Sequence, residues 1–275
     1  MDVVRSHAAR LPAIDDRWEP RHHDRDELIL GLLDGRVAFE EVSHPLDNVL
    51  RNIGLLVGGD PDKQFGLSGL NGFSRREILE LVGAAAGFEP DHYASTGPVP
   101  VDPERVLLAC ERVGDRMAEA CRRGERVIFA TGHPVGLIHL YTAVGRELRA
   151  RGVELLTPAD GLTWHDDERD HPWQIRYLEG VALLTDIASA RHTHSPDPMR
   201  RMLELERPDL VFADHGWAGA AIEDGVDTVS IADVNDPALV VAQAQGRSET
   251  VIVMDDNVRP EGYWPCFQAI VSRLP

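Results

Sequence analysis

Short apolar runs alternate with longer amphipathic segments throughout the second half of the chain. The runs are rich in Val, Ile, Leu and Ala, which is typical of strands buried on both faces, and the segments between them are long enough for helices. Strands separated by helices favour a parallel sheet covered on both sides. We therefore expect an α/β fold with a mostly parallel, Rossmann-like sheet and flanking helices. The expected strands are residues 126–130, 153–156, 209–213, 228–232 and 250–254, a hairpin joins 174–178 to 181–185, and the expected helices are 134–151, 198–206, 217–224, 237–245 and 263–273.

The first half of the chain has mainly helical patterns. Ser74 and Glu77 have the spacing of a capping box ahead of an apolar stripe. Asp102 and Pro103 suit an N-cap followed by the first helical position, and Gly124 suits the end of that helix. We expect three parts along the chain: an N-terminal arm at 1–23, a helical subdomain at 24–124 and an α/β catalytic domain at 125–275.

Charge and cysteine content exclude several classes of protein. The 275 residues carry 28 basic and 46 acidic side chains, a formal net charge of −18. Such a chain is poorly suited to nucleic acid or to an anionic membrane surface, because both are held by Lys and Arg. Three cysteines do not make a disulfide framework, and no signal peptide pattern is visible. We expect a cytoplasmic soluble protein.

Polar clusters follow the expected strands at 209–213, 228–232 and 250–254. Carboxyl ends of parallel strands meet at one edge of a sheet, where such folds bind ligands. Each cluster alone is explained by helix capping, since Asp and Asn are common N-caps. Three of them together favour a carboxylate-lined pocket. The candidate metal ligands are Asp214, Asp233, Asn235, Asp255 and Asn257, with His215 and Asp236 as candidate catalytic residues.

Carboxylates gathered in one pocket repel one another unless a cation compensates their charge. Oxygen ligands from Asp and Asn are the ligands that Mg²⁺ and Mn²⁺ prefer. The sequence therefore predicts a divalent cation as cofactor, with Mg²⁺ or Mn²⁺ as the first choice, and the phosphate chemistry that such ions support. The twelve histidines of the chain leave a softer metal as the alternative.

The turn after residues 126–130 is a candidate phosphate site formed by Thr131, Gly132 and His133. Pro134 suits the first position of a following helix, whose N–H groups and dipole would attract an anion. Gly132 would let the backbone approach the phosphate closely. An ordinary turn between strand and helix explains the same residues. No Walker loop and no Gly-rich dinucleotide motif occurs in the chain.

Two further groups of residues are candidates for contacting substrate. His192 and His194 would share one face of an extended segment, next to Arg191, and suit metal ligands, hydrogen-bond donors to phosphate or a general acid. Asn48 and Asn52 share one face of a helix. The alternatives are a surface histidine pair, and amides that only pack.

Several segments of the α/β part resemble a group of actinobacterial proteins described simply as phosphatases. The resemblance covers most of residues 120–275. A looser similarity links the chain to the metal-dependent damage-control phosphatases, which pair a helical half with an α/β half. Their Asp-Asn-Gly-Glu turn is replaced here by Thr131-Gly132-His133-Pro134. The segments similar to the actinobacterial group are Phe212–Ala220, Ile231–Pro237, Gly132–Pro134 and His192–Pro196.

Residues and resemblance together predict a phosphatase that hydrolyses a phosphomonoester of a small phosphorylated metabolite with metal-activated water. His215 or His192 would protonate the leaving oxygen. A sugar-phosphate isomerase or lyase is the alternative enzyme, and a non-catalytic sensor of an anionic metabolite is the alternative from another class. The expected partner is that metabolite, with no nucleic acid and no membrane, and the chain could pair as a homodimer.

Overall fold

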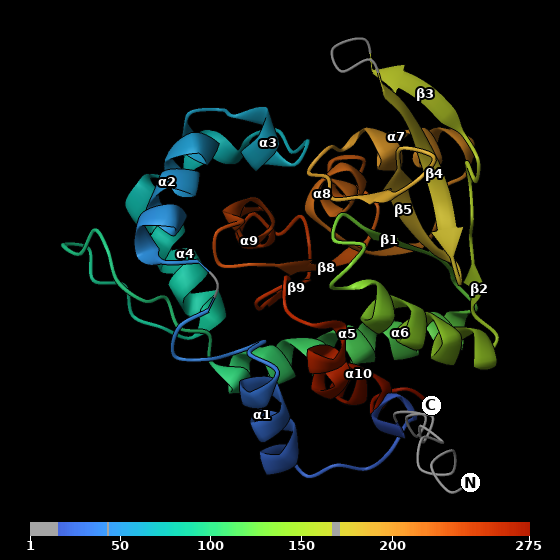
Figure 1. Cartoon of the computed structure of the whole chain (residues 1–275), viewed down its shortest axis with the longest axis horizontal. Coiled ribbons are helices and arrows are strands. Elements are labelled where there is room, and N and C mark those ends of the chain that lie inside the picture. Colours follow the sequence, from blue (N-terminus) through green and yellow to red (C-terminus); the bar gives the residue numbers. More distant parts are fainter. Residues whose placement is uncertain (1–15, 43, 167–170) are drawn as a thin grey trace, which may run out of the picture.

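The computed structural model describes residues 16–42, 44–166 and 171–275, and it confirms the predicted α/β class (Figure 1). In this part of the chain nine strands form one sheet, in the order β3-β4-β5-β1-β7-β8-β9, with β2 beside β1 and β6 beside β5. The strands are β1 (Arg126–Thr131), β2 (Glu154–Leu155), β3 (Thr163–Asp166), β4 (His171–Leu178), β5 (Val181–Thr185), β6 (Ala190–Arg191), β7 (Leu210–Asp214), β8 (Thr228–Ala232) and β9 (Thr250–Val253).

Helices precede the sheet and connect its strands. The α-helices are α1 (Arg25–Asp34), α2 (Leu46–Val57), α3 (Pro61–Gln64), α4 (Arg75–Ala86), α5 (Pro103–Arg123), α6 (Ile138–Ala150), α7 (Asp197–Leu205), α8 (His215–Glu223), α9 (Pro237–Ala244) and α10 (Trp264–Val271). Short 3₁₀ helices are η1 (Asp16–Trp18), η2 (Leu70–Gly72) and η3 (Pro260–Tyr263).

The direction of the strands explains where a ligand can bind. β1 is parallel to β5 on one side and to β7 on the other, and β7, β8 and β9 are parallel to one another. Parallel strands thus follow on both sides of β1, with β5 on one side and β7 on the other. This arrangement makes the carboxyl end of β1 a topological switch point. The antiparallel pairs of β4 with β3 and β5 extend the sheet away from this point.

Two helical layers cover the sheet. Helices α5, α6 and α10 lie together on one side, and α8 and α9 pack against β7, β8 and β9 on the other (Figure 1). Helices α2 and α4 pack on the outside of α9, whereas α1 packs against α5 and α10. A single cluster of buried apolar side chains runs through both halves of the chain. The first half is helical as predicted, but α5 serves as a covering helix of the sheet.

Two expectations need correction. Helix α6 begins at Ile138 instead of residue 134, because residues 134–137 form turns and Gly136 passes close to the backbone of Asp256. No strand is predicted in the polar stretch that follows residues 153–156. The structure has strand β3 there, and it pairs with β4.

In the predicted arm, Trp18 is buried and stacks on His139 at 4.1 Å between ring centroids. Residues 1–15 of that arm lie outside the described residues.

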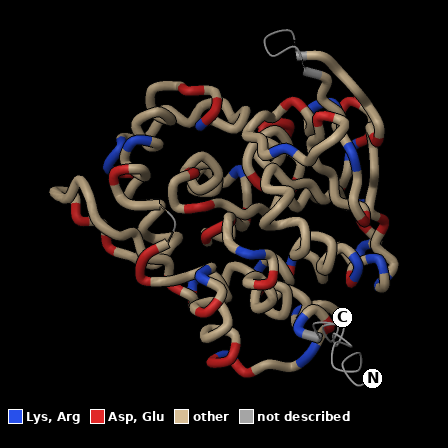
Figure 2. The backbone as a smooth tube through the Cα atoms, in the orientation of Figure 1, with Lys and Arg blue, Asp and Glu red and all other residues tan. Residues whose placement is uncertain are grey.

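Charged residues are distributed over the whole molecule. Asp and Glu are interspersed with Lys and Arg along the outer elements (Figure 2). Among the described residues, no helix combines the length and apolar character that crossing a bilayer requires.

Candidate active site

The polar residues that follow β1, β7, β8 and β9 come together at the carboxyl ends of these strands. His215, at the start of α8, is the centre of the group. Its Nδ1 lies 2.8 Å from Oδ1 of Asp214, and its Nε2 lies 3.2 Å from Oδ2 of Asp236 and 3.6 Å from Oδ2 of Asp256. The imidazole is 1% exposed. One buried ring thus lies between three carboxylates from three strand ends.

Asp214 orients His215 and the turn after β1. Its Oδ1 accepts a hydrogen bond of 2.7 Å from the Gly132 N–H in addition to its contact with the imidazole. A carboxylate on one nitrogen of a histidine leaves the other nitrogen for a metal, which is the usual outer-shell arrangement at metal sites. Among the described residues, the groups of three or more potential His, Cys, Asp or Glu ligands do not include Asp214. The geometry favours a supporting position for this residue over the predicted ligand position.

The carboxylates after β8 and β9 perturb one another. Burial, with the charges of Asp256 and Asp255, raises the pKa of Asp233 well above its usual range. Burial and the neighbouring Asp236 raise the pKa of Asp256 to about 8, although His215 opposes this. Burial also acts on Asp236, but its contact with His215 lowers the pKa of that carboxyl to about 2. Negative charge on one of these carboxyls therefore disfavours negative charge on its neighbours.

Burial opposes a charge on His215 itself. The contacts with Asp214 and Asp236 and the charge of Asp256 nevertheless raise its pKa well above the ordinary histidine value. Without a metal, the protonated ring supplies the positive charge that the surrounding carboxylates require.

Several buried polar atoms of the cluster have no hydrogen-bond partner in the described part of the chain. Buried polar groups are almost always paired, and an orphaned group costs about 1–3 kcal/mol. A bound cation would give such atoms a partner. These atoms are Nε2 of His215, Oδ1 of Asp236, Oδ2 of Asp256, Oδ1 of Asn235 and Oδ2 of Asp214.

Three groups of side chains have the spacing of metal ligands, with their ligand atoms within 4.8 Å of one another. Two of them, built around carboxylates, share Asp256, and two share His215. In the all-histidine group, Nδ1 of His215 already contacts Asp214. The two groups that contain carboxylates offer oxygen ligands, which suit a hard cation better than imidazole nitrogens do. The groups are His215–Asp236–Asp256, Asp233–Asp255–Asp256 and His133–His192–His215.

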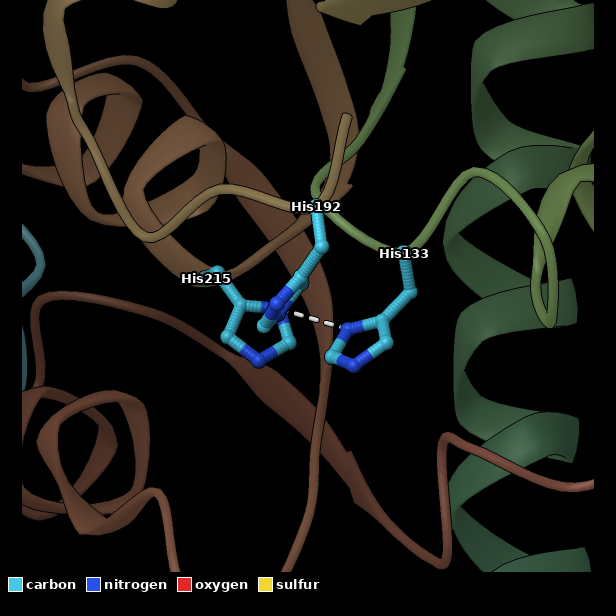
Figure 3. Close-up of side chains that lie close together, drawn as sticks. All are labelled: His133, His192 and His215. Atoms are coloured by element: carbon cyan, nitrogen blue, oxygen red, sulfur yellow. Dashed lines mark hydrogen bonds between the residues drawn. The ribbon is translucent and has the colours of Figure 1, made fainter. Parts of the chain in front are cut away.

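Three histidine rings gather around His215, and two of them, His133 and His192, appear with it in Figure 3. Nδ1 of His133 lies 3.3 Å from Nδ1 of His215, and the His194 ring stacks on the His215 ring at 4.8 Å. The His192 ring lies 4.2 Å from the His133 ring. His192 is exposed, so it lies where the cluster meets solvent.

These outer imidazoles are neutral at pH 7. Burial and the charge of His215 lower the pKa of His133 to about 3 and that of His192 to about 4. The same causes lower the pKa of His194.

The turn after β1 differs from the predicted phosphate cradle. The Gly132 N–H donates to Asp214, and the His133 N–H donates to Oγ1 of Thr131 at 2.9 Å. Pro134 does not begin a helix, because α6 starts at Ile138. The turn therefore uses these two N–H groups within the protein, and His133 contributes its side chain to the site.

The predicted amides from the first half reach the same loop. Nδ2 of Asn52 donates to the carbonyl oxygen of Asn235 at 3.0 Å, and Oδ1 of Asn48 accepts from Nδ2 of Asn235 at 3.2 Å. Both contacts hold the loop after β8 in place. The amides of α2 thus position the loop that carries Asp233 and Asp236.

Two predicted residues lie away from the cluster. Arg191 is exposed in β6, and its Nε donates to Asp186 at 2.7 Å. Asn257 is exposed and lines a separate cavity of about 850 Å³ between α1 and η3, together with Trp264. In the described part of the chain, the side chain of Arg191 pairs with Asp186, and Asn257 reaches the cluster through its backbone N–H, which donates to Oδ1 of Asp255 at 3.0 Å. The predicted side-chain roles of both residues lack geometric support.

Four residues of the site were not among the predicted ones, namely His44, Asp62, Lys63 and Asp256. Nε2 of His44 lies 3.5 Å from Oδ2 of Asp233, Nζ of Lys63 lies 3.9 Å from Oδ1 of Asp236, and Nδ1 of His194 lies 3.0 Å from Asp62. Asp256 could have been found because it directly follows the predicted ligand Asp255. Lys63 could have been found because it is the one lysine in the sequence.

The fold and this cluster define an α/β protein with a candidate hydrolytic metal site at the switch point of its sheet. Comparison with known proteins agrees: residues 23–275 match the family described as Phosphatase. The chain belongs to this phosphatase family, which confirms the resemblance noted in the sequence. It is 36% identical over 252 residues to a phosphatase of Streptomyces coelicolor, a match that covers 89% of this chain and 94% of that protein.

Proposed function

We propose that this protein is a metal-dependent phosphatase that hydrolyses the phosphomonoester of a small phosphorylated metabolite. The observation that carries the proposal is the orphaned, buried set of His215 Nε2, Asp236 Oδ1 and Asp256 Oδ2 in a member of the phosphatase family. Their carboxylate oxygens and imidazole nitrogen fit Mg²⁺ or Mn²⁺. A bound divalent cation would activate water and offset charge on the phosphoryl oxygens.

The side chains around the cluster divide into three roles. His215, Asp236 and Asp256 would hold the cation, while Asp214 keeps the His215 ring oriented through its 2.8 Å contact. Lys63 is mostly buried and next to Asp236, so its ammonium group can offset charge on a bound phosphate.

His192 is the better candidate for the proton donor to the leaving oxygen. The negative charge of a bound phosphate would raise the lowered pKa of its ring and so favour the protonated form. Both ring nitrogens of His215 face carboxylates, and its ring is buried, whereas His192 is exposed beside it. A general acid must reach the leaving group within hydrogen-bond distance, which favours the exposed ring. His133 and His194 can donate ring N–H groups to the remaining phosphoryl oxygens.

Phosphate release from a panel of phosphorylated metabolites tests the proposal. We expect activity with Mg²⁺ or Mn²⁺ that EDTA abolishes, and loss of at least about 100-fold in Asp236→Asn, because a cation ligand is removed while size is kept. Asp197→Asn, an exposed residue of α7, is the matched control and should retain activity.

Two other outcomes would contradict the proposal. Conversion of a substrate without release of phosphate would indicate the isomerase or lyase alternative. Metabolite binding without turnover, unchanged by EDTA, would indicate a sensor. For the proton donor, His192→Gln should lower kcat more than it raises KM, while His92→Gln, on the far surface beside Glu80, should change neither.

A further inference from the structure

Asp256 belongs to both carboxylate groups of the site. On one side it joins His215 and Asp236, and on the other it joins Asp233 and Asp255. All five side chains are at most 5% exposed. The two groups are therefore neighbouring positions that have one ligand in common.

The second group is oriented by the backbone. Oδ1 of Asp233 accepts the Val234 N–H at 2.5 Å, and Oδ1 of Asp255 accepts the Asn257 N–H at 3.0 Å. His44 adds a ring nitrogen 3.5 Å from Oδ2 of Asp233. Three carboxylates and an imidazole thus come together beside the first position, from the loops after β8 and β9 and from the segment before α2.

An orphaned atom points to a cation here as well. Asp256 is 2% exposed, and its Oδ2 has no hydrogen-bond partner in the described part of the chain. A buried carboxylate oxygen that accepts no hydrogen bond is costly unless a cation offsets its charge. One divalent cation at His215 and Asp236 would leave Asp233 and Asp255 outside its ligand set, whereas a second cation between them and Asp256 would bring all five side chains into the site.

We infer that the active site holds two divalent cations bridged by the carboxylate of Asp256. The first position is His215–Asp236–Asp256, and the second is Asp233–Asp255–Asp256 with His44 beside it. This inference rests on the proposed function and extends it, since two adjacent cations can clamp the oxygens of one phosphoryl group. It also assigns Asp233 and Asp255 to one cation and Asp236 to the other.

Metal stoichiometry tests the inference without relying on turnover. The purified full-length protein is stripped with EDTA, dialysed against Mn²⁺, and its bound manganese is measured by mass spectrometry. We expect two Mn²⁺ per chain in the wild type and one in Asp255→Asn and in Asp236→Asn, because each substitution disables one position. Asp197→Asn should keep two, and thermal melting of every variant checks that it is folded.

Electron paramagnetic resonance distinguishes a bridged pair from two separate ions. The wild type should give an exchange-coupled Mn²⁺ signal, and Asp255→Asn and Asp256→Asn should give only the spectrum of isolated ions. One Mn²⁺ per chain in an active, EDTA-sensitive wild type would overturn the inference and leave the proposed function standing. Full phosphatase activity with no bound metal would overturn both.

Discussion

His215 combines an unusual backbone conformation with a central place in the site. Its φ of 46° lies in the left-handed region, which residues other than glycine adopt at a cost of about 1–3 kcal/mol. The next residue is Gly216, where an added Cβ would meet the carbonyl oxygen of His194 at 2.1 Å. Close packing at this junction of β7 and α8 holds the imidazole between Asp214 and Asp236. Such strain is typical of functional positions.

Gly132 is required for packing, in contrast to the expectation that it leaves room for an anion. An added Cβ would lie 2.4 Å from the carbonyl oxygen of Thr193 and 3.0 Å from Oδ1 of Asp214. We predict that Gly132→Ala lowers the free energy of unfolding by about 1–3 kcal/mol, because backbone and Asp214 must move. Urea denaturation measures this.

Gly72→Ala is the matched control for Gly132, since a Cβ there meets nothing within 4 Å and φ is not positive. Its free energy of unfolding should stay close to the wild-type value. An equally stable Gly132→Ala would show that the turn after β1 relaxes more easily than its contacts suggest.

At the scale of elements, α5 links the two halves of the protein. It packs against β9 and α10, and its buried stripe includes Val106, Cys110 and Met117. Asp102 is its N-cap and accepts the Glu104 N–H at 2.9 Å. Orphan N–H groups at a helix start need such a partner.

We predict that Asp102→Ala lowers the free energy of unfolding by about 1 kcal/mol, whereas Asp102→Asn changes it by only a few tenths. The reason is that Asn keeps a side-chain oxygen for the N–H groups and Ala does not. Thermal and urea unfolding of both variants check this. Equal losses in Asn and Ala would indicate that the charge of Asp102, and not its hydrogen bond, stabilises α5.

At the scale of the whole molecule, contacts between distant segments hold the first half on the second. The carboxylate of Glu223, at the end of α8, accepts the N–H of Ser68 at 2.9 Å and its hydroxyl at 2.5 Å, and it pairs with Arg247. Burial alone would raise the pKa of Glu223, but Ser68 and Arg247 lower it below the ordinary value.

This lowered pKa predicts the pH dependence of stability. The contribution of Glu223 is present above the ordinary glutamate pKa of about 4.3 and is lost as pH falls through the lower folded-state pKa. Glu223→Gln should therefore destabilise the protein by up to about 1 kcal/mol at pH 7, a small value because the pair is partly exposed. The difference from wild type should shrink toward pH 3.

Urea unfolding at pH 7 and pH 3 measures the effect, with Glu204→Gln on the exposed side of α7 as the control. A difference that stays constant between the two pH values would assign the contact to packing and not to charge.

The strands other than β3 and β6, and the meeting of Asp214, Asp233 and Asp255, could be predicted from the sequence. Apolar runs mark buried strands, and parallel strands bring their carboxyl ends to one edge of the sheet. The capping patterns at Ser74 and Asp102 also predicted helix starts that the structure confirms, because a cap depends only on residues a few positions away.

The sequence by itself thus determined the α/β class, the edge of the sheet where polar residues meet and the starts of well-capped helices, since these depend on local pattern and on the geometry of parallel strands. Only the tertiary structure decided that α6 begins late, that Asp214 accepts the Gly132 N–H, and that His44 and Lys63 join the carboxylates. These features arise where loops and helices far apart in the sequence pack together. No local pattern encodes them, because each contact depends on the position of its partner in space.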